Sequence, residues 1–156
     1  MSGRRVIQFY RTGDAYGEFS NFAPFPVRIG GRVWPTTEHY FQAQKFAGTD
    51  DQHAEAIRKA NSPMAAARMG RDRTKKLRRD WESVKVGVMR DALAAKFDQH
   101  PPLAALLLST ADARLVEHTA NDAYWGDGGD GSGRNVLGQL LMELRERLTG
   151  GADGRP

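Results

Sequence analysis

The sequence predicts an α+β fold, a predominantly helical single domain with a small β-sheet. Short β-branched and aromatic segments near the N-terminus, such as VIQFY at residues 6–10, are typical of strands. Gly30-Gly31 lies between two further segments of this kind, which favours a two-residue hairpin turn. From residue 36 onward, polar caps and prolines open a series of longer helical segments. No repeat or linker divides the 156 residues, a length that suits one domain with its own core.

Composition excludes several classes of protein. Hydrophobic residues make up 40% and charged residues 27% of the chain, as in ordinary globular proteins. No run of about 18 apolar residues is present, so we expect no membrane-spanning helix and no membrane partner. The N-terminal MSGRRVIQFY lacks the apolar segment of a secretory signal. Cysteine is absent, which excludes disulfides and thiolate metal sites and suits a cytoplasmic protein.

Basic residues are concentrated in one segment. The net charge is +4, and residues 68–79 (RMGRDRTKKLRR) hold seven of the 23 basic residues and one of the 19 acidic ones. The rest of the chain, with 16 basic and 18 acidic residues, has a balance of −2. Such a patch attracts phosphate or nucleic acid. The alternative is a solvated connector between helices.

The first elements are expected to be strands. After the strand at 6–10 comes RTGDAYGEFSNFAPFP, whose Gly, Asp, Asn and Pro residues are typical of a loop. PVRI and RVW then flank the glycine pair as the two arms of the hairpin.

Helix starts are marked by serine, threonine and aspartate caps and by prolines, which suit the first helical turn. The expected starts are Pro35 with Thr36 or Thr37 as cap, Thr49 with Gln52 completing a capping box, Ser62-Pro63, Asp80, and Pro101-Pro102. The remaining expectations are a helix end near Gln99, a short helix through LAALLLS, a strand at ARLVEHT, a glycine-rich loop at 121–135, an amphipathic helix at 135–148, and a flexible tail at 149–156 after a domain spanning 1–148.

The helix TTEHYFQAQKF (36–46) carries a polar stripe on an otherwise apolar surface. At about 100° per residue, Glu38, Gln42 and Lys45 fall on one face, with Phe41 beside them. A helix that is apolar on most sides is expected to be buried, and its polar stripe must then face a polar cavity or internal partners. The stripe is therefore either the wall of a pocket or a structural Glu–Lys pair that closes a gap in the core.

The helix after Asp80 has a comparable stripe. Its members are Trp81, Lys85, Val88, Met89, Ala92 and Lys96. Lysines on such a stripe are expected to extend to solvent, most of all Lys96 near the helix end, where a cation also suits the helix dipole. Lys85 lies in the middle of the stripe and could meet an anionic ligand.

The glycine-rich loop WGDGGDGSGRN matches G-x-G-x-x-G only by count. A dinucleotide site needs a strand directly before the motif and a βαβ unit, and here Asp127 and Asp130 would repel a pyrophosphate. The spacing does not fit an EF-hand. The loop is either a mere turn or a base-stacking lid that presents Trp125, Asp127 and Asn135 beside a helix N-terminus.

Serine-triad and zinc chemistry are disfavoured. The chain has no cysteine and no G-x-S-x-G elbow, and the four histidines (His39, His53, His100 and His118) show no metal-binding spacing. We expect no metal and no cofactor.

Several co-linear motifs resemble those of the NADAR domain family, which includes the YbiA-like N-glycosidases. They are EFSNF (18–22), WPTTEHYFQAQKF (34–46), the SP…A…MGR segment (62–71), DW…K…VM (80–89), ALAAKF (92–97) and WGDGGDGSGRNVLGQLLMELR (125–145). The resemblance covers roughly residues 6–148 in the family's order, without a clear departure in the motifs. It implies a small α+β domain that binds ribosyl or ADP-ribosyl groups and hydrolyses an N-glycosidic bond.

The resemblance also implies two classes of substrate. Family members act on ribosylaminopyrimidine phosphate intermediates of early riboflavin synthesis, and others remove ADP-ribose from guanine in DNA or RNA. The basic segment favours a nucleic-acid partner, since a small metabolite needs only one or two cations.

The expected catalytic residues are Glu38 and Lys45. Cleavage of a C1–N bond develops oxocarbenium character, so a carboxylate near C1 is stabilising, and Glu38 is our choice as electrostatic stabiliser or general acid–base. The family's mechanism, by resemblance, favours a lysine that attacks C1 and forms a Schiff base. Lys45 is the first candidate and Lys85 the second. Such a lysine must be partly neutral, which burial and nearby cations favour.

Further residues are expected to bind the substrate: Asn21, Phe22 and Trp34 around the ribose or base, Trp125 stacked on the leaving base, Arg71 at a phosphate, and Gln42, Trp81, Lys85, Gly126, Asp127 and Asn135 beside them. Two other hypotheses remain open. The protein is either a non-catalytic module that binds ADP-ribose or nucleic acid, or its polar stripes are internal pairs of the core.

Overall fold

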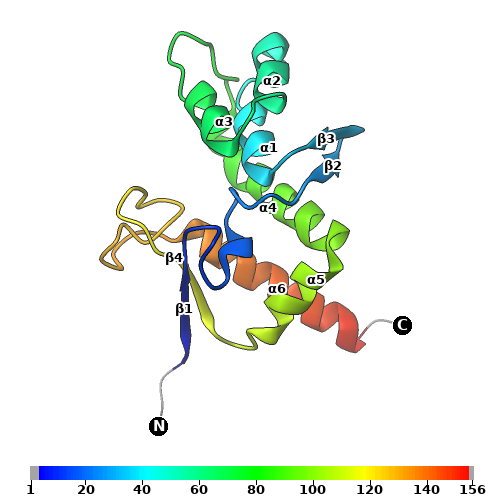
Figure 1. Ribbon diagram of the computed structural model, residues 1–156, viewed down its shortest axis with the longest axis vertical. Helices are drawn as coiled ribbons and strands as arrows, with labels where there is room; N and C mark the ends of the chain where they lie inside the picture. Colours follow the sequence, from blue (N-terminus) through cyan, green and yellow to red (C-terminus); the bar gives the residue numbers. More distant parts are fainter. Residues whose placement is uncertain (1–3, 155–156) are drawn as a thin grey trace. The chain divides into compact units, whose positions relative to one another are not determined.

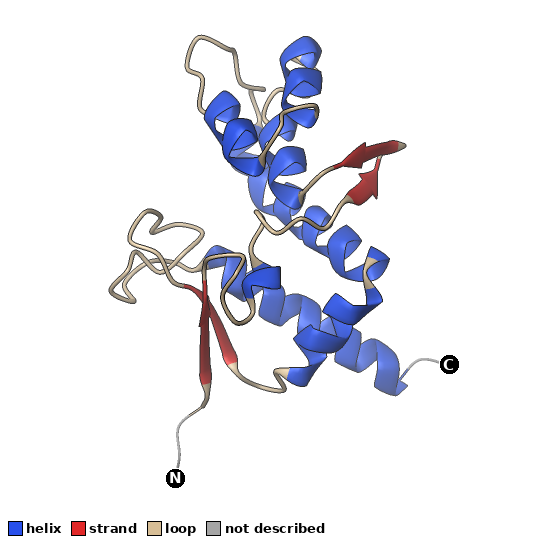
Figure 2. Ribbon diagram, viewed as in Figure 1, coloured by secondary structure: helices blue, strands red, loops and turns tan. Residues whose placement is uncertain are grey.

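The computed structural model describes residues 4–154, with side chains from residue 4 to residue 150. Within this range the fold is mostly helical with small sheets, as the sequence predicts (Figures 1 and 2). The chain divides into two compact units. One contains the residues up to Ser20 together with those from His100 on, and the other is Asn21–Gln99. The expectation of a single domain stays a prediction.

The first unit is built from both ends of the chain. Its elements are β1 (Val6–Phe9), a 3-10 turn η1 (Gly17–Phe19), α5 (Pro101–Ser109), β4 (Arg114–Glu117) and α6 (Val136–Gly154). Strands β1 and β4 are parallel, with Val6 opposite Arg114 and Phe9 opposite Glu117. Helix α6 packs against β4 and α5 (Figure 1).

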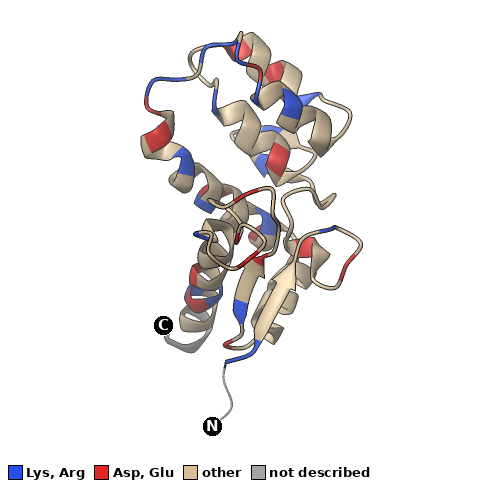
Figure 3. Cartoon of the chain, turned by 90° about the vertical axis from the view of Figure 1, so that its left-hand side faces the viewer, with Lys and Arg blue, Asp and Glu red and all other residues tan. Residues whose placement is uncertain are grey.

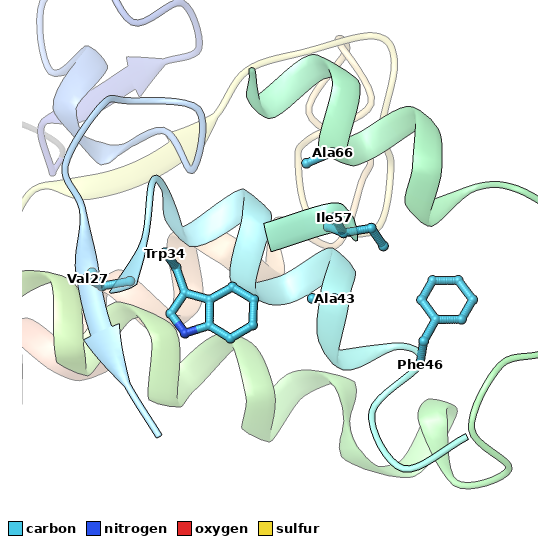
Figure 4. Close-up of a cluster of buried hydrophobic side chains, with 6 residues drawn as sticks. All are labelled: Val27, Trp34, Ala43, Phe46, Ile57 and Ala66. Atoms are coloured by element: carbon cyan, nitrogen blue, oxygen red, sulfur yellow. The ribbon is translucent and has the colours of Figure 1, made fainter. Parts of the chain in front are cut away.

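The second unit contains a hairpin and four helices. Its elements are β2 (Val27–Ile29), β3 (Arg32–Trp34), α1 (Thr37–Gln44), α2 (Asp51–Arg58), α3 (Pro63–Gly70) and α4 (Trp81–Gln99). Helix α1 contacts α2, α3 and α4 and is therefore the centre of this unit. Its core contains a cluster of apolar side chains, drawn in Figure 4: Val27, Trp34, Ala43, Phe46, Ile57 and Ala66.

Most local signals of the sequence are confirmed. Gly30 and Gly31 have φ angles of 64° and 78° and form the hairpin turn that only glycine adopts readily. The Thr36 hydroxyl accepts the N–H of His39 and so caps α1, and Ser62 caps α3 in the same way through the N–H of Ala65.

The predicted start of α2 is wrong by one residue. The cap is Asp50, whose carboxylate accepts the N–H of His53, and not Thr49. The carboxylate of Asp51 accepts the N–H of Gly48 and closes the turn before the helix. A carboxylate at the cap also meets the positive end of the helix dipole, so aspartate competes successfully with the neighbouring threonine.

The prediction that Lys96 extends to solvent is also wrong. Its side chain is 1% exposed, and Nζ lies 5.8 Å from the centre of the Phe25 ring and 5.9 Å from that of Phe97. Cation–π contact with aromatic rings contributes to holding an ammonium group inside the unit. Lys96 is near the end of α4 in sequence, but the segment before the hairpin covers it.

Helix α6 is longer than predicted. It runs to Gly154, whereas the sequence places the helix end at residue 148. Residues 155 and 156 of the predicted tail lie outside the described residues, and the flexibility of the tail stays a prediction.

Candidate active site

Helix α1 is held firmly at its start. The backbone N–H of Glu38 donates to the carbonyl of Asn21 at 3.2 Å, and the Thr37 hydroxyl donates to Asn21 Oδ1 at 2.7 Å. Asn21 Nδ2 in turn contacts Met89 Sδ on α4 at 3.3 Å. Asn21, predicted as a substrate contact, therefore fixes the first turn of α1 against the preceding loop and α4.

Glu38 and Gln42 lie one turn apart on the same face of α1. Glu38 is 9% exposed and Gln42 is 5% exposed. The Gln42 amide donates from Nε2 to Glu38 Oε2 at 2.8 Å. This hydrogen bond fixes the orientation of the carboxylate.

Lys45 follows the last residue of α1 and is half-buried. Its Nζ donates to the carbonyl of Gly70 at 3.4 Å and lies 5.9 Å from the centre of the Phe41 ring. Burial lowers the pKa of Lys45 below its ordinary value of 10.5. Glu38 opposes this shift, whereas the cations Arg71 and Lys85 reinforce it. Burial and nearby cations are the two causes expected from the sequence for a lysine nucleophile.

Arg78 fixes the end of α1 that carries Lys45. Its backbone N–H donates to the carbonyl of Lys45 at 2.8 Å, and its guanidinium donates to that of Gln44 at 3.4 Å. Asp80 holds the same guanidinium through two hydrogen bonds of 2.6 and 3.2 Å. The last carbonyls of a helix lack partners within the helix, so Arg78 supplies them from the loop after α3.

The start of α4 approaches the same helix face. The Trp81 ring is buried and meets the Phe41 ring edge to face, with 5.1 Å between the ring centres. Lys85 is 18% exposed and forms an ion pair of 2.8 Å with Glu82. The charge of Lys85 is one of the causes that lower the pKa of Lys45.

Other predicted contacts of this unit have different surroundings. Trp34 belongs to the core cluster, and its indole N–H donates to the carbonyl of Ile29 at 3.1 Å (Figure 4). Phe22 is half-buried, and Arg71 is exposed directly after α3. The core position of Trp34 accounts for this residue without a ligand. Its role in substrate binding stays a prediction.

The basic segment 68–79 forms the end of α3 and the loop to α4 (Figure 3). Six of its seven cations are exposed: Arg68, Arg71, Arg73, Lys75, Lys76 and Arg79. Arg78, the seventh, is the residue that binds the end of α1. The segment is thus both the connector that the sequence suggested and an exposed basic surface.

In the other unit, the loop before α6 is organised around Asp127. This carboxylate is 4% exposed and accepts hydrogen bonds from the N–H groups of Thr119 and Gly129 and from His118 Nδ1, all within 3.0 Å. Burial alone would raise the pKa of Asp127, but the hydrogen bond from His118 and those from the two N–H groups outweigh it and lower the pKa.

The neighbours of Asp127 have similar internal roles. Asn135 has a φ of 52°, and its side chain donates to Leu115 and accepts from Glu117, both at 2.9 Å, which ties the start of α6 to β4. Gly126 lies so close to the carbonyl of Glu117 that a Cβ would be 2.8 Å from it. Trp125 is half-buried, with its ring centre 5.0 Å from that of Tyr124. The loop is therefore a built structure and more than a mere turn.

A family model described as the NADAR domain matches residues 8–149. This chain belongs to the NADAR domain family. It is 66% identical over 143 residues to N-glycosidase YbiA of Escherichia coli strain K12, covering 92% of this chain and 88% of the relative. The solution structure of E. coli YbiA covers 100% of this chain and 92% of its own, with a TM-score of 0.89 and 60% identity. The riboflavin biosynthesis protein PYRR of Zea mays is 45% identical over 158 residues, which is 93% of this chain and 25% of that protein.

The similarity confirms the NADAR resemblance, the fold class, and the enzyme class of an N-glycosidase. The roles of individual NADAR residues in this chain stay predictions. In the part of the chain that the structure describes, no cluster of His, Asp and Glu suits a metal ion, and no helix is long and apolar enough to cross a membrane.

Two residues of this candidate site were not found from the sequence. The carbonyl of Gly70 accepts from Lys45, which lies 25 residues earlier in the chain, and Arg78 donates to Gln44, which lies 34 residues earlier. No periodicity marks such contacts. The only signals were their places in the MGR motif and in the basic segment.

Proposed function

We propose that this chain hydrolyses the C1–N bond of N-ribosyl compounds with Glu38 and Lys45 as its catalytic residues. The observation that supports this most is the arrangement on α1. A buried carboxylate oriented by Gln42 and a lysine whose pKa is lowered by burial lie on one helix face. A group whose pKa is shifted toward neutrality by burial and neighbouring charges is a typical candidate for catalysis.

Glu38 acts on the developing charge. As the bond between C1 and the ring oxygen breaks, positive charge grows on C1 and the base nitrogen, and a carboxylate fixed nearby stabilises it. Opening of the sugar ring also requires a proton on the ring oxygen, which water delivers while Glu38 stays ionised.

Lys45 acts on C1 of the opened sugar, where C1 is an iminium bonded to the base nitrogen. The neutral amine of Lys45 adds to C1, and a proton moves from the lysine nitrogen to the base nitrogen. The bond from C1 to the base breaks with its electron pair on the leaving nitrogen, and Lys45 remains as an iminium at C1. Water then adds to C1, the lysine leaves as an amine, and the aldehyde closes to ribose. The reaction consumes one water.

Two substrates of this chemistry are proposed. A ribosylaminopyrimidine phosphate is supported by the similarity to PYRR, a protein of riboflavin biosynthesis. ADP-ribose attached to guanine in DNA or RNA is supported by the exposed cations of the basic segment, because phosphate backbones bind such surfaces. The second candidate function, a module that binds ADP-ribose or nucleic acid without turnover, is favoured by the same basic segment.

The test is turnover of both substrates by the wild type and by the variants Glu38→Gln and Lys45→Ala. We expect release of free base by the wild type from at least one substrate and loss of release in both variants, with an unchanged circular dichroism spectrum. Full activity of both variants would overturn the assignment of the catalytic residues. Binding of either substrate without release of base by the wild type would favour the binding module.

A further inference from the structure

Gly70 ends α3, packs against Gln42 on α1 and accepts a hydrogen bond from Lys45. Its φ is not in the left-handed region, so the backbone conformation does not require glycine here. The reason for glycine must therefore lie in what surrounds its Cα.

The space beside the Gly70 Cα is filled by Gln42. A Cβ at this position would lie 1.9 Å from Gln42 Oε1, 2.7 Å from Cδ and 3.0 Å from Cβ. Gln42 is 5% exposed, and its amide is bonded to Glu38, so the side chain has little freedom to move aside. Any larger residue at position 70 would displace the amide that orients Glu38.

The contact also accounts for a buried oxygen that has no hydrogen-bond partner in the described part of the chain. Gln42 Oε1 is buried and has no hydrogen-bond partner among the described atoms. The hydrogen on Gly70 Cα that takes the place of a side chain points toward this oxygen, which is the geometry of a weak C–H···O contact. The amide cannot turn over, because its Nε2 then could not donate to Glu38.

The carbonyl of the same glycine accepts the hydrogen bond of Lys45 Nζ at 3.4 Å. One residue of α3 thus meets the Gln42–Glu38 pair with its Cα and the Lys45 amine with its oxygen. Because α1 and α3 pack directly on each other, these two contacts hold the Gln42 amide and the Lys45 amine against the same residue of α3.

We propose that Gly70 is a positioning residue of this N-glycosidase, which sets Glu38 through Gln42 and Lys45 through its own carbonyl. The inference rests on the proposed roles of Glu38 and Lys45. It assigns Gln42 to the orientation of Glu38 in place of a contact with the substrate.

The experiment is a double-mutant cycle of Gly70→Ala and Gln42→Ala, with Gly87→Ala as the matched control. Gly87 lies within α4, and a Cβ there meets nothing within 4 Å, so this variant is expected to keep wild-type turnover. We expect Gly70→Ala to lower kcat by roughly tenfold to a hundredfold with a smaller change in KM, since misplacement by about 1 Å has such effects. The kcat of the double variant should be no lower than that of the less active single variant, because alanine at position 42 leaves room for the new methyl group.

The double-mutant cycle tests the proposal even if Gly70→Ala fails to fold. The double variant should then fold and show the activity of Gln42→Ala, measured with thermal unfolding beside kcat. The proposal is overturned if Gly70→Ala keeps the wild-type kcat, or if the losses of the two single variants multiply in the double variant. Failure of the proposed function is a separate result, namely retained turnover in Glu38→Gln and Lys45→Ala.

Discussion

At the scale of single residues, the burial that lowers the pKa of Lys45 carries a cost in stability. Its pKa is lower in the folded protein than its ordinary value of 10.5, mainly because of burial. The unfolded chain therefore binds this proton more tightly. The free energy of unfolding should rise as pH increases from the lowered pKa toward 10.5, and below that window the full cost of the buried charge is present.

This cost gives a prediction for Lys45→Met. We expect the variant to lose turnover and to unfold at a higher temperature than the wild type at neutral pH, because a partly buried charge is replaced by an apolar chain of similar length. Thermal unfolding and turnover are measured side by side. Lys59→Met, at an exposed position after α2, serves as control and should change neither quantity appreciably. A variant that loses both activity and stability would contradict this account of Lys45.

Glu38 is predicted to influence both the rate of turnover and the pKa of Lys45. In Glu38→Gln the rate constant should fall by about 10²–10³-fold, as when a group that stabilises transition-state charge is removed. Glu38 raises the pKa of Lys45, so its removal should shift the acid limb of the remaining pH–rate profile to lower pH. Glu146→Gln, exposed on α6, is the control. If the acid limb of the pH–rate profile does not shift in Glu38→Gln, Glu38 does not influence the pKa of Lys45.

At the scale of elements, the end of α1 depends on a loop far along the chain. Arg78→Ala removes a guanidinium that bridges Asp80 and the carbonyl of Gln44. We expect a loss of about 1 kcal/mol in the free energy of unfolding, the usual net value of such a bond, and lower turnover because Lys45 is held less firmly. Arg79→Ala, exposed and adjacent, should have little effect in chemical denaturation. Equal effects of the two variants would count against the role of Arg78.

The loop around Asp127 is predicted to be sensitive to acid. The pKa of Asp127 is lowered, so its stabilising effect is complete above the ordinary value of 3.8 and is lost as pH falls through the lowered pKa. Asp127→Ala should reduce the free energy of unfolding by about 2–4 kcal/mol at neutral pH, because several bonds to a buried carboxylate disappear. Asp130→Ala, whose carboxylate is exposed, should cost less. Equal losses would contradict this difference between the two carboxylates.

Elements were predictable where the deciding interaction is local. The hairpin at Gly30-Gly31 and the cap at Ser62 are settled within four residues, and both were predicted correctly. The start of α2 depended on a choice between two neighbouring caps, Thr49 and Asp50, that the pattern alone does not decide. Lys96 was misjudged because the residues that cover it, including Phe25, come from another part of the sequence.

At the scale of the whole molecule, the pairing of distant strands could not be predicted from the sequence. Strands β1 and β4 pair in parallel although more than 100 residues separate Val6 from Arg114, and no local signal specifies such a partner. The stripe of Glu38, Gln42 and Lys45 was predictable from helical periodicity. The contact of Gln42 and Lys45 with Gly70 on α3, which we propose positions the catalytic groups, was not.

Charge distribution over the whole chain leads to a prediction about substrate. The basic segment accounts for a net charge that is otherwise slightly negative. If the substrate is a modified nucleic acid, Lys75→Glu combined with Lys76→Glu should lower kcat/KM at least tenfold on an ADP-ribosylated oligonucleotide and reduce its salt dependence. Turnover of a ribosylaminopyrimidine phosphate should stay the same.

The control for this charge reversal is a double variant of equal charge, Arg114→Glu with Arg147→Glu, at exposed positions outside the segment. Both double variants are compared over a series of salt concentrations. An equal loss in the two would indicate a general effect of net charge and would contradict binding of nucleic acid by the basic segment.

The central claim is that Lys45 forms a covalent bond with C1 of the sugar during turnover. The most direct measurement is borohydride reduction of the working enzyme followed by tryptic peptide mapping in a mass spectrometer. We predict that the reduced sugar is found on Lys45, that trypsin no longer cleaves after this residue, and that Lys45→Ala gives no adduct. Turnover without an adduct, or an adduct on Lys85 in place of Lys45, would contradict the claim.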